Sequence, residues 1–409
     1  MLNALKDPAI WRQFQAYKLS GGHMNKETAA QLEALISTAG YLPVVERICR
    51  GECFAPPRKS EISKLHSDKK RVVYTYPEVE NWVLKLLTYL LQRAYDRQFA
   101  NNLYSFRPSK GVHEAVKNLT RHPAIQKQWC YKADIRNYFN SVPVEKMLPL
   151  LKATLAEEPD VYRFVEDLLK NPLVEDNGRL YPEEKGIMAG TPISAFLANL
   201  YLAHVDHYFA DRGILYARYS DDIILFCETK EALDRAVAQL HRFLAEMGLS
   251  INPDKQTYTG PGEMWTFLGI SYQNGVIDVA PVSVEKLKAK MRRKARALSR
   301  WQARKGATGP QAAKAFIRVF NRKLFENTAE HELTWVRWYF PLINTTQSLQ
   351  MIDRYSQSCI RYLATGKHSK SAYHFRYEQI KELGYISLVN RYYKQPCSPD
   401  TTDSTVGIK

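Results

Sequence analysis

The segment YARYSDDIILFC, residues 216–227, constrains the fold of this chain more than any other. It sets two adjacent acids, Asp221 and Asp222, between two runs of strand-forming residues. Apolar runs on both sides of a short polar break predict an antiparallel hairpin with the acids at its tip. Because side chains alternate along a strand, we expect the two acids to point to opposite sides, one into a site and one in support.

A second apolar segment, YKADIRNYF, ends a predicted strand at another acid, Asp134. Neighbouring strands lie about 5 Å apart, so Asp134 and Asp221 on adjacent strand ends are expected to share one site. Two Mg²⁺ ions about 3.5–4 Å apart would neutralise these carboxylates and suit in-line phosphoryl transfer. Taken alone, Asp-Asp in a hairpin is also ordinary turn chemistry, and that alternative stays open for the dipeptide itself.

The charge balance narrows the class of partner. Among 409 residues, 58 Lys and Arg stand against 42 Asp and Glu, which gives a formal net charge of +16. This excess favours a polyanionic partner, either nucleic acid or an acidic membrane face, with a merely soluble basic protein as the alternative. With 45% hydrophobic residues, the chain can bury a large core in two or three lobes.

Several classes of protein are disfavoured by the same sequence. Its apolar runs are far shorter than the roughly 20 residues of a membrane span. The start, MLNALKDPAIW, does not have the pattern of a signal peptide. Of the six cysteines only Cys49 and Cys53 lie close in sequence, and no second Cys or His pair stands at ligand spacing. A zinc site is therefore not expected. We therefore expect a cytoplasmic protein with reduced cysteines and no membrane partner.

Hydrophobic periodicity predicts mixed secondary structure. Residues 1–55 are expected to be helical, RVVYTY to be a strand, and EVENWVLKLLTYLLQRAYDRQF to be an amphipathic helix. ISAFLANLYLAHVDHYFADRG is predicted as one helix closed by Gly213, followed after the acidic hairpin by a helix through Met247. Short strands with an Asn-Gly turn are expected around TFLGISYQNGVIDV, and helices from Val282 onward. The pattern as a whole predicts an α+β core.

Six short motifs occur in the order that is typical of reverse transcriptases, from about residue 58 to residue 270. YSDD resembles the Tyr-x-Asp-Asp box of that family, and KADIRNYF resembles its first catalytic acid motif. GIMAGTPISAFLANLYL resembles its Gly-rich segment and following helix, GLSINPDK its Lys motif, and FLGI its primer-grip turn. LYSFRPSKG is similar to the Phe-Arg-Pro loop of group II intron and other bacterial members.

The resemblance implies a right-hand polymerase fold, α+β in class, with fingers, a palm of antiparallel sheet plus helices, and a helical thumb. The implied division is an N-terminal helical extension (1–55), fingers with part of the palm (56–130), palm with catalytic hairpin and inserted fingers segment (131–280), helical thumb and C-terminal RNA-binding region (281–395), and a disordered tail (396–409).

The resemblance also implies the catalytic residues. Asp134 and Asp221 would ligate two Mg²⁺ ions, for which Mn²⁺ is a substitute, with Asp222 beside them. The carbonyl of Ile135 would complete one octahedral shell. Lys255 corresponds to the lysine that protonates the leaving pyrophosphate, although a solvated surface lysine is the alternative.

A nucleotide site follows from the same comparison. Phe139 falls where the family places a side chain against the sugar 2′ position, with ordinary core packing as the alternative. Ala189 stands where relatives often have Gln, so a hydrogen bond to the nucleotide or template is absent there or supplied by another residue. Arg71 is the preferred bidentate ligand of the triphosphate. The full predicted set is Lys64, Lys69, Lys70, Arg71, Phe139, Ala189 and Gly190.

Nucleic-acid contacts are predicted in three places. The Phe-Arg-Pro loop contributes Arg107 and Lys110, and the primer-grip turn contributes Phe267, Leu268 and Gly269. A helix over VEKLKAKMRRKARALSRWQARKG is expected to bury a stripe of Leu287, Met291, Leu298 and Trp301. Its opposite face carries basic residues suited to a duplex backbone, with a solvated surface as the alternative. The predicted contacts there are Arg293, Arg300 and Arg304.

TGKHSKSAYHFRY and LGYISLVNRYY, near the C-terminus, resemble the defence-associated ("unknown group") bacterial reverse transcriptases. The implied function is RNA-directed DNA synthesis in antiphage defence, with an associated structured noncoding RNA as template or scaffold. The implied partners are that RNA, dNTPs and the cDNA product, while protein partners stay open. The alternatives are a maturase-like RNA chaperone and a template-independent or protein-primed DNA polymerase.

Overall fold

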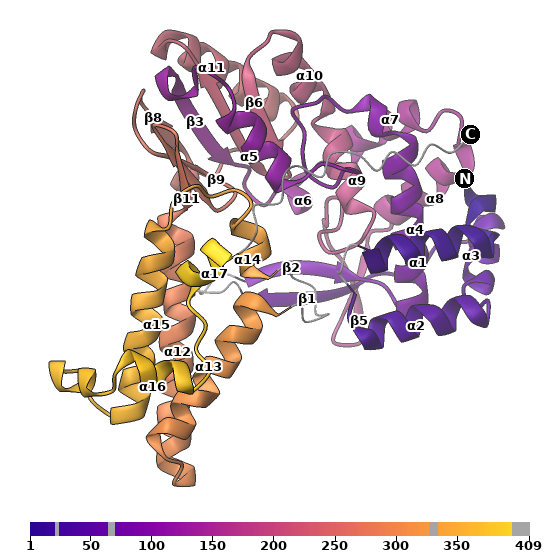
Figure 1. Ribbon diagram of the computed structural model, residues 1–409. Helices are drawn as coiled ribbons and strands as arrows, with labels where there is room; N and C mark the ends of the chain where they lie inside the picture. Colours follow the sequence, from indigo (N-terminus) through magenta and orange to yellow (C-terminus); the bar gives the residue numbers. More distant parts are fainter. Residues whose placement is uncertain (21–23, 64–69, 327–333, 395–409) are drawn as a thin grey trace. The chain divides into compact units, whose positions relative to one another are not determined.

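The computed structural model describes residues 1–20, 24–63, 70–326 and 334–394, which fall into two compact units (Figure 1). Unit 1 comprises Met1–Leu268 with Gln273–Gly275, and unit 2 comprises Gly269–Tyr272 with most of the chain from Val276 onward. The mixture of helices and sheets confirms the predicted α+β class. The finer division into fingers, palm and thumb stays a prediction, and the tail predicted to be disordered lies outside the described residues.

Unit 1 begins with helices, as its periodicity predicts. These are α1 (Pro8–Ser20), α2 (Lys26–Ser37), α3 (Leu42–Cys49) and, after two strands, α4 (Glu78–Ala94). Asn25 caps α2, since its side chain accepts a hydrogen bond from the backbone N–H of Thr28. Trp11 is fully buried and stacks on Tyr41 with ring centroids 4.5 Å apart, which fastens α1 to the start of α3.

A four-stranded sheet follows, built from two segments that are far apart in sequence. β1 (Arg58–Ser63) and β2 (Lys70–Thr75) form an antiparallel hairpin, and β4 (Leu173–Asp176) and β5 (Arg179–Pro182) form another. The strand order is β2-β1-β4-β5, because β1 pairs in parallel with β4. The predicted RVVYTY strand is therefore present as β2.

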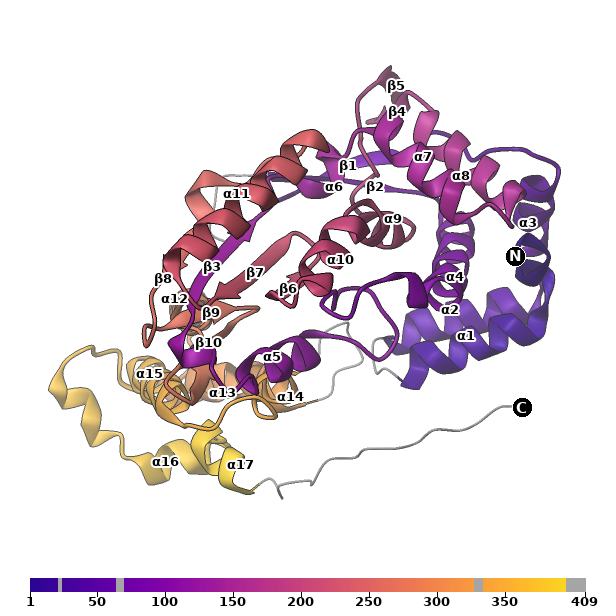
Figure 2. The ribbon, with the colours of Figure 1, turned by 90° about the horizontal axis from the view of Figure 1, so that it is seen from above.

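The second sheet of unit 1 carries the acids that the sequence singles out. Its strands are β3 (Trp129–Asp134), β6 (Leu215–Tyr219), β7 (Asp222–Cys227) and β8 (Thr257–Thr259), in the order β6-β7-β3-β8. Helix α11 (Lys230–Glu246) contacts β3 and β7, as Figure 2 shows. Further elements of the unit are α5 (Val112–Thr120), α6 (Tyr138–Ser141), α7 (Val144–Thr154), α8 (Pro159–Lys170) and β9 (Trp265–Phe267).

One predicted helix is in fact two. Residues 194–213 form α9 (Ser194–Tyr201) and α10 (Ala203–Asp211), with a break at Leu202. At the end of α9, the carbonyl of Ala198 accepts a hydrogen bond from the Tyr138 hydroxyl, and the carbonyl of Asn199 accepts one from Arg218. Tertiary donors therefore compete for carbonyls that a continuous helix would use four residues later. Periodicity alone does not contain this competition.

Unit 2 is almost wholly helical after one hairpin. Strands β10 (Ile270–Gln273) and β11 (Val276–Val279) meet at the predicted Asn-Gly turn, where Asn274 and Gly275 both have positive φ. The helices are α12 (Pro281–Lys305), α13 (Gly309–Phe325), α14 (Trp335–Tyr339), α15 (Gln347–Thr365), α16 (Tyr377–Glu382) and α17 (Leu388–Lys394). Helix α12 packs against α15 and α13.

The predicted stripe on α12 needs one correction. Leu287, Met291 and Leu298 are buried as expected, but Trp301 is 36% exposed. Trp301 lies near the end of α12, which closes at Gly306 in the left-handed conformation. The buried apolar stripe therefore stops at Leu298, about two turns before the helix ends at Lys305.

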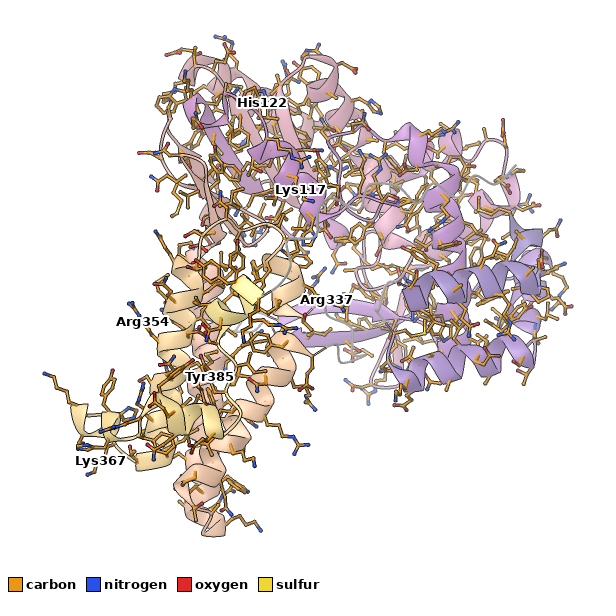
Figure 3. All side chains as sticks on the ribbon, in the orientation of Figure 1. Lys117, His122, Arg337, Arg354, Lys367 and Tyr385 are labelled. Carbon is orange, nitrogen blue, oxygen red and sulfur yellow. The ribbon has the colours of Figure 1, made fainter. Side chains whose placement is uncertain are left out.

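A buried carboxylate ties the C-terminal helices of unit 2 together. Asp353 on α15 accepts hydrogen bonds from the hydroxyl of Tyr385 (2.7 Å; labelled in Figure 3) and from that of Ser387 (2.7 Å). It also accepts from the backbone N–H groups of Leu388 and Val389, at the start of α17.

Among the helices that the structure describes, none has the length and apolarity needed to cross a bilayer.

Candidate active site

The tip of the β6–β7 hairpin is a two-residue turn made by Ser220 and Asp221. Tyr219 pairs with Asp222 across the hairpin, so only two residues connect the strands. Ser220 has φ +59°, a left-handed conformation that costs a non-glycine residue free energy. The acids thus sit on a tight and locally strained turn.

Polar side chains from distant segments hold this turn. The backbone N–H of Ser220 donates to the hydroxyl of Ser105 (2.9 Å), and that hydroxyl donates to Oδ1 of Asn199 (3.0 Å). The Asn199 amide in turn donates to the carbonyl of Ser105 (2.7 Å). This closed set of bonds fixes the turn to the loop before α5 and to α9.

A fully buried ion pair lies beneath the turn. Arg218 Nη2 is 2.5 Å from Asp206 Oδ2, and both side chains are 0% exposed. Arg218 also donates to Asp206 Oδ1 (2.8 Å) and to the carbonyl of Ser220 (3.3 Å). Sequence reasoning missed this pair, although a lone Arg inside an apolar strand signals a buried partner.

The register brings three acids together, and it corrects the predicted arrangement in one respect. Asp134 on β3 pairs directly with Asp222 on β7, while Asp221 lies in the turn. The backbone N–H of Ile135 donates to the carbonyl of Asp221 (3.0 Å). The first acid strand therefore meets both hairpin acids, and not Asp221 alone.

The electrostatics of these acids are those of a crowded anionic site. Burial, and next the charge of Asp134, raise the pKa of Asp221. Burial, and next the charge of Asp221, raise the pKa of Asp222 to about 6. Lys255 and Arg71 partly offset the effect on Asp221. A cation bound between such carboxylates would stabilise their ionised forms.

One such cation is supplied by the protein. Lys255, in the 3-10 helix η4 (Pro253–Lys255), places its Nζ 2.6 Å from Asp134 Oδ2. The described residues do not include three Asp, Glu, His or Cys side chains already converged as metal ligands. The chemistry of the donor set nevertheless fits Mg²⁺, because it offers hard carboxylate oxygens beside the backbone of Ile135. The ammonium of Lys255 marks where positive charge is favoured.

Two of the predicted nucleotide residues contact each other, and one of them, Arg71, is close enough for its charge to act on Asp221. Phe139 is half-buried, and the Arg71 guanidinium carbon lies 6.0 Å from the centroid of its ring. Phe106 packs edge-on against Phe139, with centroids 6.4 Å apart. Lys70 pairs with Glu61 at 2.7 Å on the exposed hairpin. Lys64 and Lys69 lie outside the described residues.

The Gly-rich segment packs on β2 and on the start of α6. Tyr74 N–H donates to the carbonyl of Ala189 (2.7 Å), and Ala189 N–H donates to Asn140 Oδ1 (3.1 Å). Gly190 has φ +101°, and a Cβ there would lie 3.0 Å from the carbonyl oxygen of Tyr74. A Cβ at Gly186 would collide with the carbonyl of Phe139. Glycine at both positions thus allows the Gly-rich segment to approach the protein's own backbone closely.

Asn140 was not singled out from the sequence. Its Oδ1 accepts from Ala189, and its amide donates to the carbonyl of Val72 (3.3 Å), so it links the Gly-rich segment to β2. The signal that could have found it is a polar residue after Phe139, at a point where the acid motif turns into a helix.

The Phe-Arg-Pro loop corrects another prediction. Arg107 is buried, and its guanidinium donates to Asp96 (2.7 Å) and to the carbonyls of Ala100 and Leu103. This geometry makes Arg107 a brace for its own loop instead of a nucleic-acid contact. Lys110 is half-buried and donates to Asn101.

The remaining predicted contacts fall near the boundary of the units or in unit 2. Phe267 is fully buried, and Leu268 has φ +49°. Gly269 has φ +85°, and a Cβ there would lie 3.0 Å from the Tyr339 hydroxyl. Arg293, Arg300 and Arg304 are exposed on α12, as predicted for its basic face.

Comparison with known proteins covers the segment that holds the acids. The family model described as reverse transcriptase (RNA-dependent DNA polymerase) matches residues 59–272, just over half of the chain. The Retron Mx65 reverse transcriptase of Myxococcus xanthus is 23% identical over 298 residues, covering 69% of this chain and 66% of that protein. The Group II intron-encoded protein LtrA of Lactococcus lactis subsp. cremoris is 22% identical over 169 residues, covering 41% of this chain and 28% of that protein.

Two further matches are another retron reverse transcriptase and a telomerase. The Retron Ec86 reverse transcriptase of Escherichia coli is 23% identical over 183 residues, covering 44% of this chain and 53% of that protein. Apo telomerase from Candida tropicalis superimposes with a TM-score of 0.48 at 10% identity, covering 81% of this chain and 59% of the telomerase chain. The chain spans less than two thirds of the length of each of these proteins.

Proposed function

The chain belongs to the reverse transcriptase family, and on that premise we propose that it is an RNA-directed DNA polymerase. The observation that carries the proposal is the meeting of Asp134, Asp221 and Asp222 where β3 ends and the β6–β7 hairpin turns. RNA binding alone would not need three clustered carboxylates, in which burial and neighbouring acids raise the pKa of Asp221 and Asp222. Phosphoryl transfer does, because its metal ions need clustered anionic ligands.

We propose that the cofactor is Mg²⁺, with Mn²⁺ as a substitute. Asp134 and Asp221 would hold the ions, with Asp222 beside them and the carbonyl of Ile135 as a further ligand. When bound, Mg²⁺ supplies Lewis acidity and neutralises charge on the transferring phosphoryl group. The rigid turn around Ser220 would keep the carboxylates in place for this purpose.

The residues beside the acids support a role in nucleotide selection. Lys255, already 2.6 Å from Asp134, is placed to hold a proton for the leaving pyrophosphate. Arg71, whose charge acts on Asp221 as that of Lys255 does, would bind phosphate oxygens with its guanidinium. Phe139 would lie against the sugar and exclude a 2′-hydroxyl. Ala189 is engaged by its backbone only, so it adds no side-chain contact.

We further propose that a structured noncoding RNA serves as template or scaffold, with dNTPs as substrates and cDNA as product, in cytoplasmic antiphage defence. The net charge of +16 supports a long nucleic-acid footprint. The retron relatives support an RNA-templated reaction. The defence role depends on the resemblance of residues 365–377 and 383–393 to defence-associated enzymes.

The decisive test replaces the hairpin acids. Asp221→Asn with Asp222→Asn should abolish Mg²⁺-dependent dNTP incorporation on a primed RNA template, because two of the three carboxylates lose their charge. RNA affinity should persist, since neither residue belongs to a basic surface. The measurement is primer extension beside filter binding on the same preparations.

The matched control is Asp160→Asn with Asp211→Asn, which removes two exposed acids of the same unit. The control should extend primers like the wild type. Full extension by the Asp221/Asp222 variant would refute the polymerase proposal. A wild type that binds RNA but never extends a primer would favour the RNA chaperone.

A further inference from the structure

Helices α1 and α4 carry a group of cations and aromatic rings that the proposed active site does not use. The group consists of Lys18 on α1 with Lys85 and Arg93 on α4, and we call it the α1–α4 cation patch. The Arg93 guanidinium carbon lies 3.6 Å from the ring centroid of Tyr89 and 4.4 Å from that of Tyr17. The two tyrosine rings have centroids 5.0 Å apart.

The two lysines also rest on aromatic rings. Lys85 Nζ lies 3.9 Å from the centroid of Trp82, which is buried. Lys18 Nζ lies 5.5 Å from the centroid of Phe14 and 5.8 Å from that of Tyr17. These cation–π contacts hold the ammonium groups in place without neutralising them.

Acids compensate the charges of these cations only in part. Within the part of the chain that the structure describes, Lys18, Lys85 and Arg93 form no ion pair with an acid. Burial, and next the charge of Arg93, lower the pKa of Lys18. Burial, and next the charge of Lys18, lower the pKa of Lys85, against a smaller opposite effect of Glu78. The three cations therefore repel one another, and an anion would relieve that repulsion.

The rings decide which anion fits best. Tyr17 is 45% exposed beside the cations, so a planar group can reach part of this side chain although Arg93 and Tyr89 contact its ring. A ligand with phosphates for the cations and an unpaired base for the ring matches both features. An acidic protein segment would use the charges but not the ring.

We propose that the α1–α4 cation patch binds a single-stranded segment of RNA, separately from the strand at the active site. Figures 1 and 2 both place α1 and α4 in unit 1 away from strands β3 and β7. Phosphates contact Lys18, Lys85 and Arg93, and a base stacks at Tyr17. The inference rests on the proposed function only in that the RNA proposed there supplies the segment.

The first test reverses two charges of the patch in the full-length protein. Lys18→Glu with Arg93→Glu should weaken binding of a single-stranded oligouridine. It should also flatten the log–log salt dependence by about 1.4, since each phosphate contact to a single strand contributes about 0.7. The matched control, Lys6→Glu with Lys26→Glu, makes the same charge change at exposed sites of unit 1 outside α1 and α4. An unchanged slope in the patch variant alongside wild-type affinity would overturn the proposal.

The second test addresses the ring. Tyr17→Ala should weaken oligouridine binding about fivefold or more, while Tyr17→Phe should keep most of the affinity. Polyglutamate serves as the competing ligand. If it binds as tightly as the RNA and loses as much affinity in the charge-reversed variant, the patch recognises acidic chains and the proposal fails.

Ultraviolet crosslinking of the wild type to oligouridine keeps the proposal testable if a charge-reversed variant does not fold. Crosslinked peptides from α1 or α4 are expected, and their absence would contradict the proposal. The result is independent of catalysis. Wild-type protein that extends no primer but shows these crosslinks would refute the proposed polymerase function and leave the patch intact. Protein that extends primers normally but shows no crosslinks from α1 or α4 would refute RNA binding at the patch and leave the proposed polymerase function standing.

Discussion

At the scale of single residues, the ionised carboxylate of Asp222 lowers the stability of the folded protein. It is largely shielded from water, it faces Asp134 across the sheet, and its pKa is raised to about 6. An ordinary Asp has a pKa of about 3.9 in the unfolded chain. The folded protein therefore holds a proton there more tightly than the unfolded chain does.

This difference fixes the pH dependence. A raised carboxyl pKa stabilises the fold below about pH 4, and that contribution is lost as the pH rises through about 6. Asp222→Asn keeps the shape without the charge, so in EDTA it should stabilise the protein by about 1–3 kcal/mol at pH 8. The variant and the wild type should differ little at pH 4. Denaturant titrations at the two pH values test this, and equal stabilities at pH 8 would contradict it.

Phe139 allows a prediction about substrate choice. Its ring is half-buried and contacts Phe106 and Arg71, five residues after Asp134 in the chain. Phe139→Ala should raise the ratio of kcat/KM for rNTPs over dNTPs, because a 2′-hydroxyl would gain room. Phe139→Tyr keeps the ring and should keep the wild-type ratio. Equal ratios for Ala and Phe would show that this residue belongs to the core only.

At the scale of elements, regular apolar patterns were predictable and long-range polar bonds were not. The strands around Asp134 and Asp221 and the Asn-Gly turn follow from local pattern and propensity. The break at Leu202 does not, since it depends on Arg218 and Tyr138, which reach α9 from elsewhere in the chain.

The candidate site divides in the same way. The three acids and Lys255 are found from motifs, and they do come together. The environments of Arg107 and Trp301 were mispredicted, because burial of a side chain depends on neighbours that are distant in sequence. Ser105 and Asn140 have no local signal of comparable strength, as their partners lie 115 and 49 residues away.

The basic face of α12 carries the prediction at this scale. Charge reversal at Arg293, Arg300 and Arg304 should flatten the salt dependence of RNA binding by about two to three units. It should reduce extension of a bound primer more than it changes the Mg²⁺ dependence. Filter binding over a salt series measures the slope. A control with Lys6, Lys26 and Arg212 reversed should keep the slope, and an unchanged slope in the α12 variant would mean that this face is only solvated.

At the scale of the whole molecule, the excess of 16 positive charges is distributed unevenly, since residues 269–409 contribute most of it. We expect one structured RNA to copurify with the full chain, held by phosphate contacts and by stacking at unpaired bases. Sequencing the nucleic acid from purified protein would identify it. A mixture of unrelated cellular RNAs, released at the same salt concentration, would contradict a dedicated template.

The Arg218–Asp206 pair beneath the Ser220–Asp221 turn has a consequence for how such sequences can diverge. Replacing either residue alone would strand a charge in the interior, at a cost of about 3–5 kcal/mol, a large share of the stability of an ordinary domain. Replacing both at once with apolar residues of matching volume need cost far less. Evolution by one substitution at a time is therefore strongly disfavoured at these two positions. Diverged members of the lineage should have inherited the two residues together or lost them together.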